Sequence, residues 1–113
     1  MTEPPITTTP SGEVVISPHG RLDMVTAPLL REQLRALVQR GNIHVVVDLS
    51  GVDLIDSGGL SALISGLKAA RQAGGSLRIV RPSKQARSIL KLTNLHRVFE
   101  PFDAADGAHS DPI

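Results

Sequence analysis

The sequence predicts a single α/β domain, in which a mixed and mainly parallel β-sheet packs against three to four helices. The chain has 113 residues, the size of one domain. Its apolar residues form short continuous runs, typical of buried strands, between longer runs with helical spacing. The order is strands, helix, strand, helix, strand, helix and a last short strand. This alternation favours parallel strands joined by helical crossovers.

The first half of the chain predicts an arm, a strand and a helix. Residues 1–12 are rich in Thr and Pro, and we interpret them as a flexible arm with room for a short edge strand. Residues 13–17 read as a strand that Pro18, His19 and Gly20 break or bend. A helix then follows, with Thr26 as the expected N-cap and a proline in the first turn, and it ends at a Gly-Asn pair.

The second half continues the alternation. Residues 43–49 are almost entirely apolar, as in a strand that is buried on both faces of a sheet. We expect a helix over 58–73 that ends at two glycines, a strand over 77–80, and a helix over 83–92 capped by Ser83. The residues expected to pack inward after this point are Ala86, Ile89, Leu90, Leu95, Val98 and Phe99, with Phe102 closing a last short strand.

The ends of the chain differ in composition from its centre. We expect the folded domain to span 13–103, between the flexible arm and a disordered tail over 104–113. The tail is polar and has too few apolar residues to pack.

The composition argues against several classes of binding partner and site. The net charge is +1, so there is no electrostatic case for nucleic acid or for an acidic membrane surface. Two Phe and no Tyr or Trp leave no platform for stacking bases. The absence of cysteine excludes disulfides, thiolate catalysis and cysteine-ligated zinc. With neither a signal peptide nor a membrane-length apolar run, we expect a cytoplasmic protein.

The most informative segment is Asp-Ser-Gly-Gly-Leu at 56–60, at a turn that leads into a predicted helix. It places the hydroxyl of Ser57 beside the carboxylate of Asp56 and before two glycines. The first N–H groups of a helix have no partner within the helix, and the helix dipole favours negative charge there, so a phosphate is tolerated. Ser57 is therefore a helix cap, a catalytic nucleophile or a phosphorylation switch.

The chain lacks the patterns of common enzyme sites. A nucleophile elbow needs Gly-x-Ser-x-Gly, whereas residue 55 is Ile. There is no P-loop pattern, and the four histidines are scattered without metal-ligand spacing. A receiver-like domain with Asp48 as phosphoacceptor and Lys84 beside it fails because the acidic pair that would hold magnesium is missing. We expect no catalytic residue, no metal and no cofactor.

Four elements, in order, resemble a known family. Gly20-Arg21-Leu22-Asp23 is similar to the Gly-x-Leu-Asp element of STAS domains, and residues 45–60 resemble the signature of bacterial anti-sigma factor antagonists. Residues 74–80 and 92–99 are similar to the later part of that family. The resemblance covers about 13–103 and implies a STAS-like fold.

The resemblance also implies a function, which is partner switching. Such an antagonist binds an anti-sigma factor that is also a serine kinase of the GHKL ATPase fold, and so releases a sigma factor. The kinase phosphorylates the serine that matches Ser57, and a metal-dependent serine phosphatase reverses the modification. The implied partner-binding residues are Asp23, Asp56, Ser57, Gly58, Gly59 and Leu60. Residue 58 is Gly where many members have Ser or Thr, which leaves Ser57 as the one hydroxyl of the turn.

Simple physics supports such a switch. A phosphate adds about −1.5 to −2 charges to the turn. Rejecting a partner a hundredfold needs only about 2.7 kcal/mol, which repulsion and burial of the charge at an interface can supply. We expect a monomer or weak dimer. The alternative is a STAS scaffold subunit of a transport or stress-signalling complex, in which Ser57 is never phosphorylated.

Overall fold

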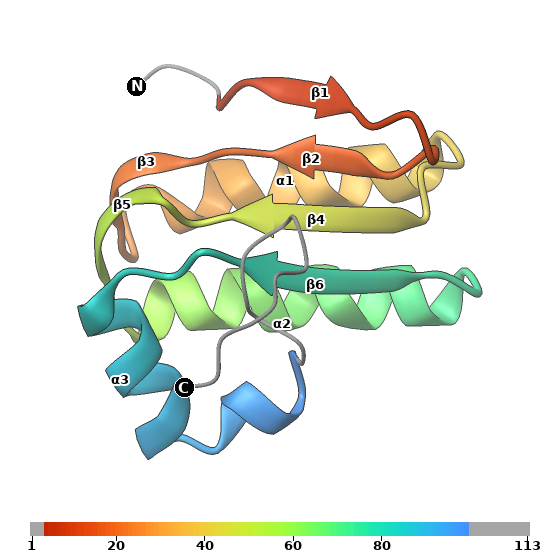
Figure 1. Ribbon diagram of the computed structural model, residues 1–113. Helices are drawn as coiled ribbons and strands as arrows, with labels where there is room; N and C mark the ends of the chain where they lie inside the picture. Colours follow the sequence, from red (N-terminus) through yellow and green to blue (C-terminus); the bar gives the residue numbers. More distant parts are fainter. Residues whose placement is uncertain (1–3, 100–113) are drawn as a thin grey trace.

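The computed structural model describes residues 4–99 and contains a four-stranded sheet (Figure 1). Its strands lie in the order β1 (Ile6–Thr8), β2 (Val14–Ile16), β4 (His44–Asp48) and β6 (Ser76–Val80). β1 pairs antiparallel with β2, and the other neighbours are parallel. The mixed, mainly parallel sheet that the sequence predicts is therefore confirmed. β1 is the short edge strand that we considered within the N-terminal arm.

Two further strands, which the sequence analysis missed, form a separate parallel pair. They are β3 (His19–Leu22) and β5 (Gly51–Ile55). The expected break is confirmed before Pro18, because β2 ends at Ile16. His19 and Gly20 belong to β3, where Gly20 adopts a φ of +81° and the register shifts after it. Each strand is short and carries glycine and charged residues, so each resembles a loop until the other pairs with it.

Three α-helices accompany the sheets within residues 4–99. α1 (Ala27–Gln39) and α2 (Ser57–Gln72) lie side by side on one face of the four-stranded sheet, whereas α3 (Lys84–Leu92) lies at the end where β5 and β6 finish (Figure 1). A 3-10 turn at Leu95–Arg97 follows α3. The expected α/β class, with three to four helices, is confirmed.

The core lies between the sheet and the α1–α2 layer. β4 is buried from Val45 to Asp48, as the continuous apolar run predicts. The helices approach closely at Gly66 of α2, where an added Cβ would lie 2.6 Å from a Leu34 side-chain carbon and 3.1 Å from one of Leu77. Glycine at this position lets α2 settle between α1 and β6.

The end of the described chain agrees with the prediction except at one residue. Ser83 caps α3 by accepting a hydrogen bond from the N–H of Ala86 at 3.1 Å. Phe99 is fully buried, whereas Val98 is 38% exposed, so its expected inward packing is wrong. In the short turn after α3 only part of the apolar residues can face the core. Phe102 and the expected tail over 104–113 lie outside the described residues.

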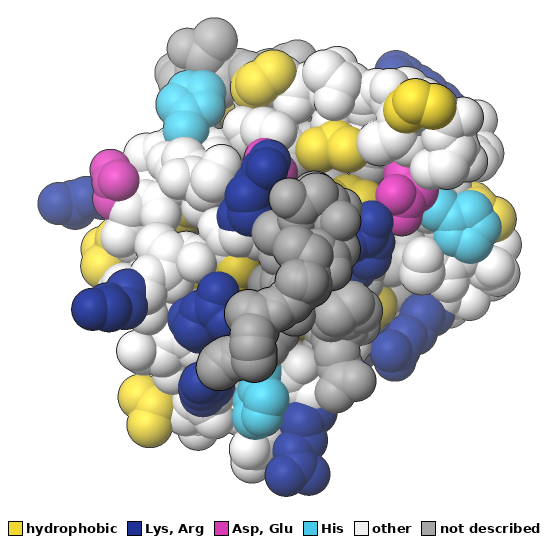
Figure 2. Space-filling view, viewed as in Figure 1, with side chains coloured by type: hydrophobic (Ala, Val, Ile, Leu, Met, Phe, Trp, Pro, Cys, Tyr) yellow, Lys and Arg dark blue, Asp and Glu magenta, His cyan; other side chains and the backbone are white. Residues whose placement is uncertain are grey.

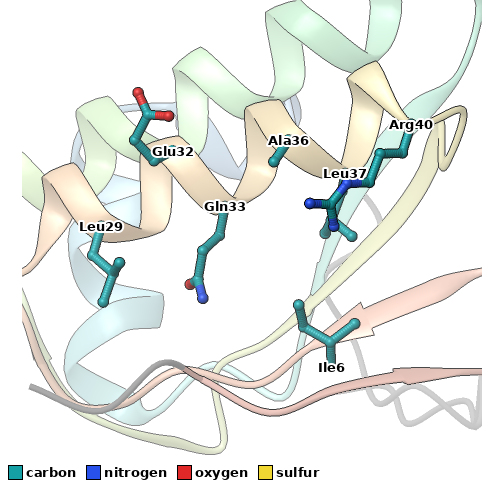
Figure 3. Close-up of a pocket in the computed structure, with 7 residues that line it drawn as sticks. All are labelled: Ile6, Leu29, Glu32, Gln33, Ala36, Leu37 and Arg40. Atoms are coloured by element: carbon teal, nitrogen blue, oxygen red, sulfur yellow. The ribbon is translucent and has the colours of Figure 1, made fainter.

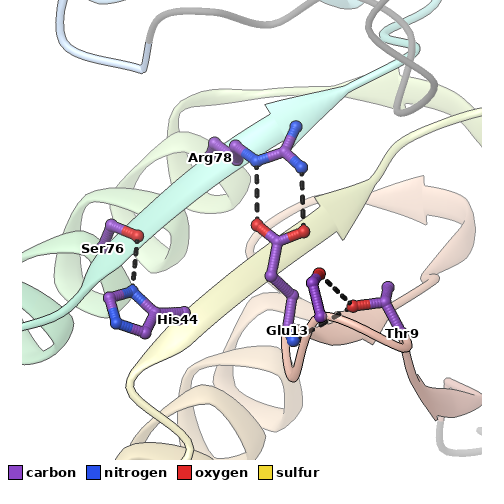
Figure 4. Close-up of polar contacts among 6 residues, drawn as sticks. Thr9, Glu13, His44, Ser76 and Arg78 are labelled. Carbon is purple, nitrogen blue, oxygen red and sulfur yellow. Dashed lines mark hydrogen bonds and ion pairs between the residues drawn. The ribbon is translucent and has the colours of Figure 1, made fainter.

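The face of the sheet opposite α1 and α2 carries polar cross-strand contacts (Figure 4). Arg78 donates two hydrogen bonds to the carboxylate of Glu13, at 3.2 and 3.0 Å, and thereby spans β4. His44 and Ser76, which are register partners on β4 and β6, bond at 3.1 Å. Figure 2 shows that Lys and Arg side chains are spread around this face of the molecule.

Candidate functional site

The residues expected to form the site meet because β3 and β5 are parallel neighbours. Leu22 and Ile55 are register partners at the carboxyl ends of these strands, so the loops that begin at Asp23 and Asp56 start side by side. The N–H of Asp56 donates to the carbonyl oxygen of Leu22 at 3.2 Å and joins the two loops. The strand pair missed by the sequence analysis is thus what assembles the site.

Asp56 is the residue that caps α2. Its carboxylate accepts hydrogen bonds from the N–H groups of Gly58, at 2.8 Å, and Gly59, at 3.1 Å. Ser57 is the first residue of α2, so the interpretation of Ser57 as the cap is wrong. The Ser57 residue is exposed, and within residues 4–99 its hydroxyl makes no hydrogen bond. The turn therefore exposes a hydroxyl that does not stabilise the described structure through a hydrogen bond.

The two glycines let the loop after β3 lie directly on the start of α2. A Cβ on Gly58 would lie 2.7 Å from Cα of Met24, and one on Gly59 would lie 2.3 Å from the carbonyl oxygen of Leu22. Gly59 is buried, and Leu60 is only 6% exposed and belongs to the core. Gly59 and Leu60 therefore support the turn from beneath, whereas Asp56 and Gly58 are partly exposed.

The loop after β3 is organised by Asp23. Its carboxylate accepts hydrogen bonds from the N–H groups of Thr26, at 3.1 Å, and Val25, at 3.0 Å, and these bonds hold the pKa of Asp23 below its usual value. Thr26 stands at the N-cap position of α1, but its hydroxyl donates to the carbonyl oxygen of Arg21 instead of capping the helix. The expected N-cap position of Thr26 is confirmed, but its side chain makes no capping bond because the hydroxyl is used within the loop.

This folded loop places two apolar side chains outward beside Ser57. Met24 is 71% exposed and Val25 is 81% exposed. Neither residue was among those expected at the site, although a Met-Val pair in a polar loop outside any helical or strand period was the available signal. The surface formed by Asp23, Met24, Val25 and Ser57, called here the switch surface, combines an apolar patch with a free hydroxyl.

Two contacts support the carboxyl ends of β4 and β5. The side-chain amide of Gln85 bonds both the N–H and the carbonyl oxygen of Ile55, a contact that the sequence did not indicate. Asp48, 7% exposed, forms an ion pair with Arg81 and accepts a bond from the N–H of Ser50. Burial raises the pKa of Asp48, but the bonds from Arg81 and Ser50 outweigh it and the pKa is lowered.

Residues 4–99 contain no group of three or more His, Asp or Glu side chains placed to hold a metal ion. None of the helices in that part is long and apolar enough to cross a membrane.

Known proteins resemble both this sequence and this structure. The family model of the STAS domain matches residues 4–108. An anti-sigma-B factor antagonist of Staphylococcus aureus is 33% identical over 89 residues, which cover 79% of this chain and 82% of that protein. An anti-sigma factor antagonist structure from Mycobacterium paratuberculosis has a TM-score of 0.81 and 29% identity, over 91% of this chain and 86% of the other.

A crystal structure from Thermotoga maritima is also similar. That protein, provisionally named an anti-sigma factor antagonist, has a TM-score of 0.85 and 26% identity, over 93% of this chain and 90% of its own. The arrangement of sheet and helices described above is therefore shared with solved proteins from several bacteria.

Proposed function

This chain belongs to the STAS domain family, and on that basis we propose that it is an anti-sigma factor antagonist switched by phosphorylation of Ser57. In the unphosphorylated form it binds an anti-sigma factor through the switch surface, and the sigma factor held by that partner is released. Phosphorylation of Ser57 ends the binding. The protein acts in the cytoplasm as a binding protein and a kinase substrate, not as an enzyme.

The main observation that supports this proposal is that Asp56, and not Ser57, caps α2. Because Asp56 caps α2 through Gly58 and Gly59, the hydroxyl of Ser57 is exposed and holds nothing in place. A kinase can therefore modify it without disrupting the helix. The new phosphate would stand beside the Asp56 carboxylate, so the turn would gain a dense negative charge on an otherwise unchanged fold.

The neighbouring side chains explain how such a charge would weaken the binding of a partner. Met24 and Val25 are the most exposed apolar residues of this surface, and contact with a partner would take them out of water. A phosphate at the edge of that contact would have to lose its hydration as well. A loss of about 2.7 kcal/mol already weakens binding a hundredfold. Burial cost and repulsion at one site are sufficient for this.

The proposed partners are those that the resemblance to anti-sigma factor antagonists implies. The anti-sigma factor is a serine kinase of the GHKL ATPase fold, so the protein that is bound is also the one that modifies Ser57. A metal-dependent serine phosphatase restores the binding form. Asp23 and Asp56 orient the two loops toward these partners, and Gly58 lets the loop at Met24 lie against the start of α2.

The test compares two serines on one helix. The wild-type protein and the Ser57→Ala, Ser57→Asp and Ser61→Asp variants are immobilised, and their affinity for the GHKL-type kinase of the same bacterium is measured. Ser61 is an exposed residue one turn further along α2, so Ser61→Asp adds the same charge outside the turn. We expect Ser57→Asp to weaken binding at least tenfold, and the other two variants to bind as the wild type does.

Phosphorylation itself is tested with the same kinase and ATP. Intact-mass spectrometry should show one phosphate on the wild type and none on Ser57→Ala. If all variants bind equally and no phosphate is added, the switch is refuted. A complex from cells that contains this chain with unmodified Ser57, unaffected by Ser57→Asp, would instead support a permanent scaffold.

A further inference from the structure

A cavity of about 270 Å³ lies between the edge strand β1 and helix α1 (Figure 3). Ile6 on β1 is the register partner of Ile16, which is fully buried under the helices, so Ile6 faces the same side of the sheet. Ile6 is nevertheless 45% exposed. The helix layer ends before it covers β1, and the cavity is the space left beneath α1. Its lining residues are Ile6, Leu29, Glu32, Gln33, Ala36, Leu37 and Arg40.

One side of the cavity is apolar. Leu29 and Leu37 lie two helical turns apart on the same flank of α1, and Ala36 lies next to Leu37. Figure 3 shows Leu29 pointing down from the helix while Ile6 points up toward it. An aliphatic chain placed here would have apolar contacts above and below.

The charged residues in the lining of the cavity are Arg40 and Glu32. Arg40 follows the last turn of α1, and its guanidinium lies beside Leu37 in Figure 3. Within residues 4–99 Arg40 forms no ion pair. Glu32 is the one acid in the lining, but it points away from the cavity and pairs with Arg35 at 3.6 Å. The cavity therefore offers a positive charge at one end.

Gln33 lies midway between Leu29 and Leu37 and points into the same space (Figure 3). Its Oε1 atom is buried, and no partner for it exists among the described residues. Burying such an atom without a partner is unfavourable. Oε1 is an acceptor, so a carboxylate can be bound only after the amide rotates and exchanges Oε1 for Nε2. That rotation breaks no hydrogen bond of the oxygen, and it lets Nε2 donate to the bound molecule.

We propose that this cavity binds a small carboxylate with a short aliphatic tail. The carboxylate pairs with Arg40 and accepts from Gln33, while the tail lies between Ile6 and the apolar flank of α1. The volume is slightly below the roughly 300–1,000 Å³ of ordinary small-molecule sites, so the ligand is small. With about 30 Å³ for each water-sized group, the cavity takes about ten non-hydrogen atoms.

This proposal is independent of the proposed function. No residue of the switch surface lines the cavity, and neither does any residue of α2. The two proposals can therefore fail separately.

The test is a titration of the isotopically labelled full chain with sodium octanoate, followed by ¹H–¹⁵N correlation spectra. Octan-1-ol, which has the same tail without the charge, is the second probe. We expect saturable shifts at the amides of β1 and along α1 from Leu29 to Arg40, with an octanoate Kd on the order of 1 mM, as suits a ligand of this size. The Gln33 side-chain amide signals should move as well.

Three variants separate the contributions. Arg40→Gln should weaken octanoate binding about tenfold and leave octanol binding unchanged. Arg71→Gln removes an equal charge from the last turn of α2, outside the cavity, and should have no effect on either probe. Ala36→Met fills the cavity and should abolish binding of both. Thermal melting of each variant checks that it is folded.

Several results would overturn the proposal. Octanoate shifts that never saturate or that scatter over the whole surface would do so. Equal weakening by Arg40→Gln and Arg71→Gln would show that the site selects nothing beyond net charge. If octanoate has no effect and an extended aliphatic peptide shifts the β1 amides, a peptide strand binds instead at the outer edge of β1, which pairs with no other strand of residues 4–99.

Discussion

Gln85 on α3 holds both backbone polar groups of Ile55. Its Nε2 donates to the carbonyl oxygen of Ile55 at 3.0 Å, and its Oε1 accepts from the N–H of Ile55 at 2.9 Å. On its other side Ile55 is the register partner of Leu22 in β3. The side-chain amide thus takes the place that a further strand would occupy. Through this pair, α3 is tied to the residue directly before Asp56 and Ser57.

Removing this amide should destabilise the fold. In Gln85→Leu both backbone groups of Ile55 lose their partner, and an unsatisfied buried polar group costs about 1–3 kcal/mol. We expect urea denaturation to show a decrease of about 2 kcal/mol in the free energy of unfolding. Lys84→Leu, on the exposed preceding residue, is the control and should change stability by less than about 0.5 kcal/mol. A loss of the same size in both variants would mean that the amide pairing is not the cause.

Asp56 should stabilise the fold by about as much as one helix N-cap does. Asp56→Ala removes the acceptor for two N–H groups at the start of α2, and such a change costs about 0.5–2 kcal/mol. In a domain of this size, 1 kcal/mol lowers Tm by about 4–8 °C. Asp56→Asn keeps an acceptor oxygen and should retain most of the stability. Equal Tm losses in Asn and Ala would contradict the capping role.

Gly59 should tolerate no side chain. In Gly59→Ala the new Cβ would lie 2.3 Å from the backbone oxygen of Leu22, so β3 and α2 must move apart. Such overpacking costs about 1–3 kcal/mol, which exceeds the gain of about 1 kcal/mol from replacing a helical glycine. Chemical denaturation should therefore show a net loss. Ser61→Ala on the exposed side of α2 is the control, and a more stable Gly59→Ala would refute this close approach.

Acid should weaken the fold partly through Asp48. The folded state lowers the pKa of this carboxyl, so its pairing with Arg81 contributes stability above the usual Asp pKa of about 3.9. That contribution is lost as pH falls through the lower, folded-state pKa. We expect Asp48→Asn to cost about 1–3 kcal/mol at pH 7 and to have a smaller further loss than the wild type below pH 4. The free energy of unfolding, measured from pH 7 to 2, checks this.

The exposed Asp53→Asn variant controls for the change in net charge. If it flattens the acid dependence as much as Asp48→Asn does, the paired carboxylate is not responsible.

The sequence alone predicted those elements whose pattern lies within one continuous segment. β4 is a continuous apolar run, and α1, α2 and α3 have helical spacing with recognisable ends, so their positions were predicted within one or two residues. The Ser57 turn was found for the same reason. Asp56, Ser57 and Gly58 are adjacent in the chain, and their meeting needs no tertiary information.

The rest depends on contacts between distant segments. β3 and β5 become strands only by pairing with each other, and Gln85 satisfies Ile55 from 30 residues away. The exposure of Met24 and Val25 follows from how Asp23 folds its own loop around Thr26. None of these relations has a period or a motif that local sequence can reveal.

The parallel pairings of the sheet have a kinetic consequence. β2 with β4, β3 with β5, and β4 with β6 each join segments that lie roughly thirty residues apart, with a helix between them. The chain must therefore close long loops before β5 is held in place, and contacts of this kind form slowly. The loop of Asp23 to Val25 meets the turn that carries Ser57 only after this closure. A kinase that recognises this loop and the Ser57 turn together would thus leave incompletely folded molecules unmodified.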